Sequence, residues 1–314
     1  LLINLLGNTT SQGVQQWATY ATGLLDLTTV SLETRKGVLA IIMKHHIAAL
    51  NNIAQDNIAL YSEFSKNILD YFLQKLINSS EYHLTSKQKD ILNNVLNNTS
   101  MHLEDMNDEG NIILAHTGCI DHVTSTISYE GYTITANKGF DLKASNSGKC
   151  RPRIRYDRAR KAQKKNLTTL IKCRKCPNMD KANAVYDSEE VRNSDALPHQ
   201  LFVDKIKGIE STKQTIGNCW IKSLNETTLI RIFIRFLEYK GVDITKKEKA
   251  GDQVKIDAAM EEAKLLEKYI RLERVKFSMQ IEEDNNGMQT TLYRELNLKK
   301  EKLEGKIYKK TNKK

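Results

Sequence analysis

The sequence His122-Val-Thr-Ser-Thr-Ile-Ser-Tyr129, followed by Glu-Gly and then by Tyr132-Thr-Ile-Thr-Ala-Asn137, determines how the centre of the chain folds. In both segments β-branched and aromatic residues alternate with small polar residues, a pattern that is typical of β-strands. Because only two residues separate the segments and one of them is glycine, we predict an antiparallel hairpin. In this hairpin Tyr129 lies opposite Tyr132, and Thr124 lies opposite Asn137.

The predicted hairpin has an apolar face and a polar face. We expect the core to be lined by Val123, Ile127, Tyr129, Tyr132, Ile134 and Ala136. The polar face carries His122 and Asn137 as diagonal neighbours, which lie roughly 7–8 Å apart in a sheet. An amide oxygen at this distance can fix the tautomer of an imidazole, the third role in a Cys–His–Asn arrangement. The structural alternative is a surface histidine on a polar sheet face.

A second signal is the sequence Gln214-Thr-Ile-Gly-Asn-Cys219-Trp220, which precedes a strongly apolar segment. Apolar residues recur at three- and four-residue spacing up to Leu237, and they predict a core helix that ends near Gly241. Cys219 then lies at the helix N-terminus, where backbone N–H groups lower the pKa of a thiol and can hold an oxyanion. A buried structural cysteine is the alternative.

The order His122, Asn137, Gln214, Cys219 resembles that of the clan of ubiquitin-like-protein proteases and adenovirus-type proteases, which includes bacterial effector deubiquitinases and acetyltransferases. The closer resemblance is to a set of bacterial effector-like proteins. It rests on four motifs within residues 110–240: Asp121-His-Val123, Tyr129-Glu-Gly-Tyr132, Asn137-Lys-Gly139 and Gln214-Thr-Ile-Gly-Asn-Cys219. The resemblance implies His122 as base, Asn137 as its orienting partner, Gln214 as an oxyanion-hole donor and Cys219 as nucleophile.

The resemblance therefore implies a thiol protease, a deubiquitinase-like virulence effector that is secreted into a host cell and cleaves peptide or isopeptide bonds of ubiquitin or a ubiquitin-like protein. A protein acetyltransferase on the same residues and a non-catalytic scaffold that binds a host protein are the alternatives. An inactive descendant is another, because Trp220 follows Cys219 directly and Gln214 stands five residues before it. Asp141 is the alternative orienting residue, and no cofactor or catalytic metal is expected.

The pattern along the chain predicts an α+β protein in three regions. Residues 1–107 are expected to be helical, with helices over 37–60, 64–76 and 85–96. Residues 110–245 are expected to form a small, partly antiparallel mixed sheet crossed by the Cys219 helix, with a basic insertion at 140–200, and the resemblance implies that this unit is papain-like or ubiquitin-like-protease-like. Ile112–Ala115 and Leu201–Val203 are further strand candidates. Residues 105–110 are the expected boundary loop.

Residues 246–314 are predicted to be a charged helix and a Lys-rich tail. Ile256, Ala263, Ile270 and Phe277 recur every seven residues, which predicts a helix that ends at Asn285-Asn-Gly287. Residues 299–314 are expected to be disordered because of their high charge.

The segment 143–175 carries thirteen Lys or Arg residues against one acidic residue, Asp157, in a chain of net charge +10. It favours an anionic partner, and a solvated, mobile insertion is the alternative. Cys150, Cys173, Cys176 and His199 are candidate ligands of a structural zinc ion, although no common zinc finger has these spacings. Five cysteines, an odd number, favour a cytosolic, reducing compartment. No apolar segment reaches the length of a membrane span, and because residue 1 is not methionine we expect the chain to belong to a longer protein.

Overall fold

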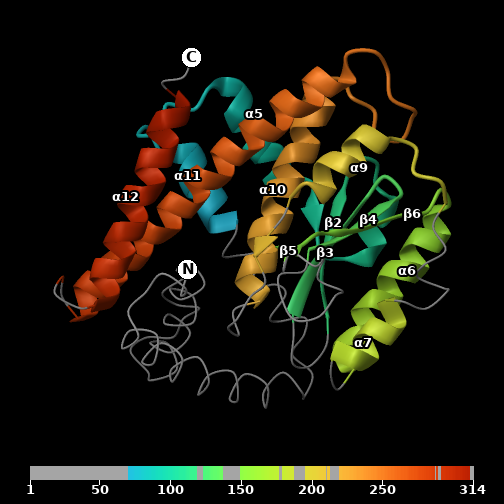
Figure 1. Ribbon diagram of the computed structural model, residues 1–314, viewed down its shortest axis with the longest axis horizontal. Coiled ribbons are helices and arrows are strands. Elements are labelled where there is room, and N and C mark those ends of the chain that lie inside the picture. Colours follow the sequence, from blue (N-terminus) through green and yellow to red (C-terminus); the bar gives the residue numbers. More distant parts are fainter. Residues whose placement is uncertain are drawn as a thin grey trace.

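The computed structural model describes residues 70–118, 123–136, 149–176, 179–186, 195–209, 211–212, 219–286, 288 and 291–311. In these residues the fold is α+β, with a five-stranded mixed sheet that has helices on both faces (Figure 1). The predicted helix over 37–60 lies outside the described residues, whereas residues 70–78, at the end of the predicted helix over 64–76, are helical. No described helix is both long enough and apolar enough to cross a lipid bilayer.

The strands of the sheet follow the order β1-β2-β3-β4-β6. β1 (Thr99–Ser100) is parallel to β2 (Ile112–Gly118), and β3 (Val123–Tyr129), β4 (Tyr132–Ala136) and β6 (Arg153–Tyr156) continue the sheet in antiparallel pairs. A separate two-stranded ribbon joins β5 (Lys149–Cys150) to β7 (Ser211–Thr212). The predicted partly antiparallel sheet is therefore confirmed.

The predicted hairpin is present, with Tyr129 opposite Tyr132 and Ile127 opposite Ile134. Its turn residues Glu130 and Gly131 have φ values of 44° and 83°, which a tight two-residue hairpin turn requires. A Cβ atom on Gly131 would lie 2.5 Å from the ring of Tyr156, so the position has no space for a side chain. Only glycine satisfies both constraints.

Both faces of the hairpin are buried, including the polar one. Thr117 Oγ1 lies 2.7 Å from the hydroxyl of Thr124 and 2.8 Å from that of Thr126, which in turn lies 2.9 Å from that of Thr135. The helix α6 (Arg160–Lys172) covers this face, where Leu167 packs beside apolar residues of β2. The polar face is therefore an interior hydrogen-bonded layer and not a solvent-exposed surface.

The opposite face is covered by α10 (Cys219–Tyr239), which confirms the predicted core helix. It ends in hydrogen bonds from Gly241 N–H to Glu238 O (2.9 Å) and from Val242 N–H to Leu237 O (3.0 Å), with Gly241 at φ 68°. This is the glycine-dependent helix stop that the sequence predicted.

The described part of the basic segment belongs to the sheet and its covering helix. β6 pairs with β4, α6 packs on β2, and the chain continues through the 3₁₀ helix η2 (Cys173–Lys175) and α7 (Met179–Tyr186). The strand predicted over Leu201–Val203 is wrong, because these residues lie in α9 (Gln200–Lys207). Its buried residues Phe202, Val203 and Ile206 share one helix face, and a window of three residues cannot reveal that spacing.

The described residues before the sheet share its core. The predicted third helix is α5 (Ser86–Asn97), and the Thr85 hydroxyl accepts a hydrogen bond from Gln88 N–H in a capping box. The 3₁₀ helix η1 (Leu103–Asn107) occupies part of the predicted boundary loop. Apolar side chains of α5, the sheet and α10 form one continuous cluster.

Two helices, α11 (Asp252–Asn286) and α12 (Thr291–Thr311), complete the described chain. Ile256, Ala263 and Ile270 are buried, so the predicted heptad positions do line a seam. Disorder from residue 299 is wrong as far as Thr311, because Leu296 and Leu303 bury α12 against the core. Two leucines seven residues apart stabilise a helix whose composition alone favours disorder.

Candidate active site at the start of helix α10

Cys219 is the first residue of α10, as the sequence predicted. Its side chain and the predicted residues His122, Asn137 and Gln214 lie outside the described residues. The described residues that flank His122, Asn137 and Cys219 in the sequence nevertheless show at which end of the sheet these positions lie.

Two contacts give the direction of α10 relative to β3. Near the start of both elements, Ser125 Oγ lies 3.2 Å from Ser223 Oγ. Near their ends, the Tyr129 hydroxyl donates a hydrogen bond to the Glu238 carboxylate. Residue numbers rise in both elements between the two contacts, so α10 and β3 run in the same direction and begin at the same end of the sheet.

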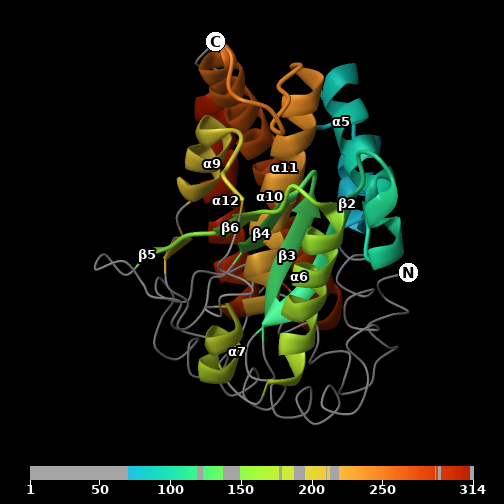
Figure 2. The ribbon, with the colours of Figure 1, turned by 90° about the vertical axis from the view of Figure 1, so that its right-hand side faces the viewer.

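Three of the predicted site residues, His122, Asn137 and Cys219, directly flank or start the elements at that end. β3 begins at Val123, directly after His122, and β4 ends at Ala136, which pairs with Ser125 and directly precedes Asn137. Cys219 occupies the helix position one turn before Ser223, about 6 Å along the axis. The β3 arrow in Figure 2 points away from this end. The start of β3, the end of β4 and the start of α10 therefore all lie at one end of the sheet.

The first turns of α10 offer a polar and electrostatically positive environment. Ser125 and Ser223 are completely buried, and Thr227 Oγ1 donates to Ser223 O at 3.3 Å. Cys219 and Ser223 are four residues apart and therefore share a helix face. Since the first N–H groups of a helix have no partner within the helix, this end favours an anion such as a thiolate or an oxyanion.

Sequence reasoning missed two buried titratable residues beside this region. His116 is 3 % exposed and pairs with Ser125, which places it on the sheet face that α10 covers. Glu226, on α10 three residues after Ser223, is 2 % exposed. The alternation Ile112, Leu114, His116 could have revealed the first, since it continues an apolar stripe.

The candidate zinc ligands have other roles where they are described. His199 Nδ1 accepts a hydrogen bond from Phe202 N–H at the start of α9, and its Nε2 lies 3.5 Å from the Asp252 carboxylate. The Cys173 thiol donates to Thr169 O at 3.3 Å. The side chain of Cys150 lies outside the described residues, and no three described His, Cys, Asp or Glu side chains are grouped to hold a metal ion.

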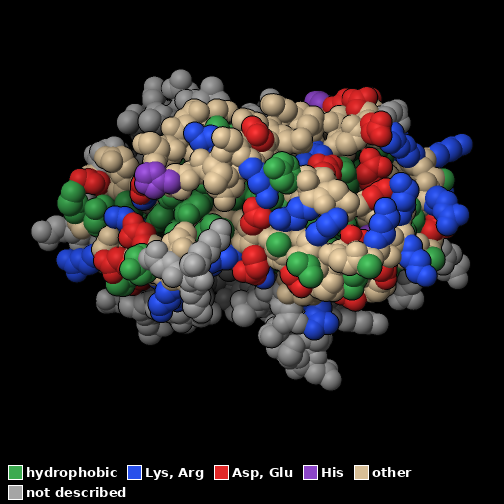
Figure 3. Space-filling view, turned by 90° about the horizontal axis from the view of Figure 1, so that it is seen from above, with side chains coloured by type: hydrophobic (Ala, Val, Ile, Leu, Met, Phe, Trp, Pro, Cys, Tyr) green, Lys and Arg blue, Asp and Glu red, His purple; other side chains and the backbone are tan. Residues whose placement is uncertain are grey.

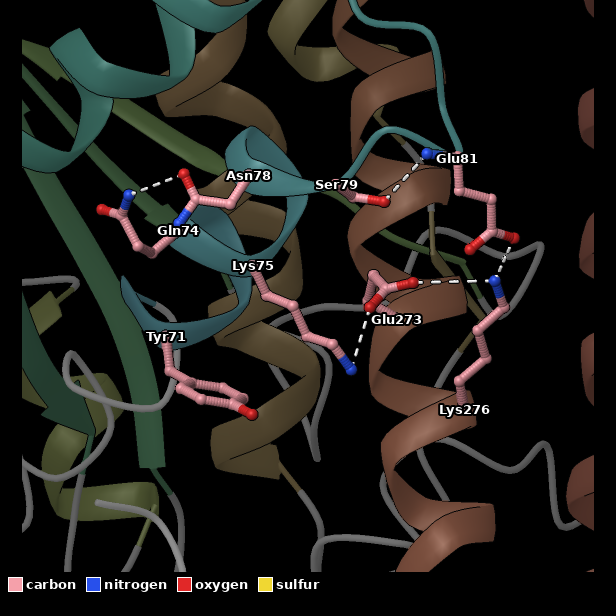
Figure 4. Close-up of a pocket in the computed structure, with 8 residues that line it drawn as sticks. All are labelled: Tyr71, Gln74, Lys75, Asn78, Ser79, Glu81, Glu273 and Lys276. Atoms are coloured by element: carbon pink, nitrogen blue, oxygen red, sulfur yellow. Dashed lines mark hydrogen bonds and ion pairs between the residues drawn. The ribbon is translucent and has the colours of Figure 1, made fainter.

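A groove of about 580 Å³ lies between residues 71–81 and α11 (Figure 4). Lys75 Nζ lies 3.0 Å from Glu273, and Lys276 pairs with both Glu273 and Glu81. Burial, together with a hydrogen bond to Glu273, raises the pKa of Tyr82. Lys75 and Lys276 therefore form ion pairs with Glu273 and Glu81. No predicted catalytic residue lines the groove.

No protein-family model, curated protein or solved structure matches this chain. The functional assignment therefore depends on the residue pattern and on the arrangement of α10, β3 and β4.

Proposed function

We propose that this chain is a cysteine-dependent acyl-transfer enzyme and that its reaction is hydrolysis of a peptide or isopeptide bond. One observation supports this most: Cys219 opens a core helix at the end of the sheet where β3 follows His122 and β4 leads into Asn137. The proposed nucleophile, base and orienting amide thus start or directly flank elements that meet.

In the proposed mechanism His122 takes the proton of the Cys219 thiol, and Asn137 holds the imidazole in the required tautomer. The thiolate attacks the substrate carbonyl, while Gln214 and the Cys219 backbone N–H stabilise the oxyanion. The amine leaves with the proton from His122. Water, activated by the same imidazole, then cleaves the thioester and restores the thiol.

The proposal also includes the papain-like or ubiquitin-like-protease-like form of the α+β fold and a bacterial effector that acts in a host cell on ubiquitin or a related protein. A core helix that starts with cysteine and packs on a mixed, largely antiparallel sheet supports the first part. The second part depends on the sequence resemblance alone.

The proposed Cys–His pair imposes one structural requirement. Ser125 faces α10, and strand alternation directs Thr124 to the α6 face. A straight extension of β3 would direct His122 to the α6 face as well. For the pair to form, the chain must turn toward α10 at the start of the strand.

The main experiment treats the purified protein with ubiquitin and ubiquitin-like proteins that carry a C-terminal electrophile and measures adducts by mass. We expect an adduct with the native chain and with the control Cys176→Ala, whose thiol is half-buried at the end of η2. The adduct should be absent from Cys219→Ala and from His122→Ala. Absence of any adduct, with a Cys219 thiol that also resists iodoacetamide at neutral pH, would contradict the proposal.

A second experiment tests the required turn. In a background without the other four cysteines, His122→Cys should form a disulfide with Cys219 on mild oxidation, because a disulfide needs Cα atoms about 4.4–6.8 Å apart. Ser128→Cys, near the far end of β3, is the matched control and should remain reduced. A His122→Cys variant that also stays reduced would show that the two Cα atoms do not come within this range and would count against a close turn of the chain toward α10.

Acetyl transfer is the second candidate function, since the same thiolate, base and oxyanion donors can pass an acetyl group to an amine. A reactive Cys219 that forms no ubiquitin-type adduct, but transfers acetyl groups from acetyl-coenzyme A to protein lysines, would favour it.

A further inference from the structure

Two cysteines that the proposed mechanism does not use lie one turn apart where α6 ends. Cys173 directly follows α6 and starts η2, and Cys176 directly follows η2. The Cys176 N–H donates a hydrogen bond to Cys173 O at 2.8 Å, which closes the turn. Both cysteines are in the reduced thiol form.

The 3₁₀ geometry of this turn aligns the two side chains. Cys173 has φ −58° and ψ −20°, which are 3₁₀ values. Side chains three residues apart eclipse each other in a 3₁₀ helix, whereas in an α-helix they are rotated by about 60°. A rise of about 2.0 Å per residue separates the two Cα atoms by about 6 Å, and a disulfide requires about 4.4–6.8 Å. Rotation of the two side chains is therefore sufficient to bring the sulfur atoms together.

The two thiols differ in their exposure to solvent. Cys173 is 2 % exposed, and its thiol donates a hydrogen bond to Thr169 O at 3.3 Å. Because an S–H group is a weak donor, rotation of the Cys173 side chain can break this bond at small cost. Cys176 is half-buried, so solvent reaches it. A reagent from solution therefore meets Cys176 first.

The turn carries exposed positive charge. Lys172 directly precedes Cys173, Lys175 directly precedes Cys176, and both lysines are exposed. Figure 3 shows Lys and Arg side chains gathered toward the right-hand end of the molecule, the side on which Figure 1 places α6 and β6. Positive charge near a reacting group raises the local concentration of anionic reagents.

We propose that Cys173 and Cys176 form a redox-active dithiol, which a small anionic disulfide such as oxidised glutathione converts to an intramolecular disulfide. The Cys176 thiol loses its proton to solvent and attacks one sulfur of the reagent, whose S–S bond breaks and releases one thiolate. The Cys173 thiol then loses its proton, attacks the Cys176 sulfur and releases the second thiolate. The protein is oxidised by two electrons, and the reagent is reduced to two thiols. This inference does not depend on the proposed acyl-transfer activity.

The pair lies toward the end of the sheet where Cys219 starts α10. Gln163, in the first turn of α6, donates to Tyr132 O at 3.0 Å beside the hairpin turn, and α6 runs along the sheet from there (Figure 2). At its other end η2 contacts β2, whose last residue, Gly118, pairs with Val123. A disulfide to Cys219 is therefore the competing product, and each product must be assigned to its cysteines.

The test treats the folded native chain with oxidised glutathione at neutral pH, blocks the remaining thiols with iodoacetamide and maps the peptides by mass. Cleavage at acidic residues leaves both cysteines in one peptide, since none lies between Asp157 and Asp180. We expect this peptide to lose two hydrogen atoms and to regain them with dithiothreitol.

Two single variants separate the roles of the two thiols. In Cys173→Ala the reaction should stop at a mixed disulfide between Cys176 and glutathione. In Cys176→Ala the Cys173 thiol should react with iodoacetamide at least about 10-fold more slowly than Cys176 does in Cys173→Ala, because a buried thiol requires local opening. The peptide map of the native chain is a test that does not depend on the folding of either variant.

A double variant tests the choice of reagent. Lys172→Gln with Lys175→Gln should slow oxidation by oxidised glutathione about 3-fold and should leave the rate with neutral 2-hydroxyethyl disulfide unchanged. Equal slowing with both reagents would overturn the anionic preference. A mixed disulfide that accumulates on Cys176 of the native chain, a disulfide to Cys219 in place of the internal one, or equal reactivity of the two thiols would each overturn the inference.

Discussion

Two arginines one turn apart on α10 are both buried, yet we expect their removal to change stability in opposite directions. Arg235 donates hydrogen bonds to Asn98 O at 2.9 Å, to Gly110 O at 2.8 Å and to the Glu238 carboxylate at 2.8 Å. Arg231 is fully buried, and none of its three guanidinium nitrogens has a hydrogen-bond partner among the described residues. Burial lowers the pKa of Arg231 to about 10, although the Asp70 carboxylate opposes the shift.

The magnitudes follow from these contacts. Hydrogen bonds to a charged group contribute about 1.5–3 kcal/mol each, and removing one partner of a buried pair costs about 3–5 kcal/mol, so Arg235→Met should lower the free energy of unfolding by about 3–5 kcal/mol. For Arg231, a pKa of about 10 instead of 12.5 corresponds to roughly 3 kcal/mol in favour of the neutral form. The folded state therefore carries this penalty at every pH below about 10, and Arg231→Met should raise the free energy of unfolding by about 1–3 kcal/mol.

Urea unfolding followed by circular dichroism at neutral pH gives the free energy of unfolding of each variant. The pair is matched, because the helix, the substitution and the change in net charge are the same. Equal dependence of the free energy on urea would show that the variants unfold from comparable states. If both variants shift stability in the same direction, or if Arg231→Met destabilises the protein by more than about 1 kcal/mol, the account of the two contacts is wrong.

Three further changes test separate features. Gly131→Ala should cost about 2–3 kcal/mol in chemical unfolding, because φ is 83° and a Cβ atom would meet a tyrosine ring; an unchanged midpoint would show that the turn adapts. Thr85→Ala should cost about 1 kcal/mol by removing the N-cap of α5, and Thr85→Ser should restore most of it. The hydrogen bond from Lys246 is the main cause that lowers the pKa of Asp243 to about 2. Because this value is below that of the unfolded chain, the contribution is present above about pH 4 and is lost as the pH falls toward 2. Asp243→Asn should make the acid-induced loss of stability slightly shallower, by less than about 1 kcal/mol since the group is exposed; an unchanged pH profile would refute the contribution.

The elements that could be predicted from the sequence are those with a local signal. The 123–136 hairpin has a turn that permits only glycine at its second position, and α10 has an apolar pattern that continues over several turns. β6 could not be predicted, because sixteen residues separate it from β4, the strand with which it pairs, and its alternation is hidden by arginines. For α12, the lysine content outweighed two well-spaced leucines.

The candidate site was predictable to a smaller extent. The N-terminal place of Cys219 follows from helix periodicity and is confirmed. The roles of His122, Asn137 and Gln214 stay predictions, because they depend on where side chains point at the ends of strands and loops. His116 was missed because the predicted strand ended at Ala115, whereas β2 continues to Gly118 and carries the buried alternation on to His116.

The contact between Ser125 and Ser223 joins residues that are 98 positions apart in the chain, and this separation affects when the proposed enzyme becomes active. During synthesis at about 5–20 residues per second, the hairpin precedes the start of α10 by roughly 5–20 seconds. The nascent chain would carry a base without its thiol throughout this interval. Activity would thus begin only after α10 has left the ribosome and docked, and a chain truncated before α10 would lack both the thiol and the cover of one hairpin face.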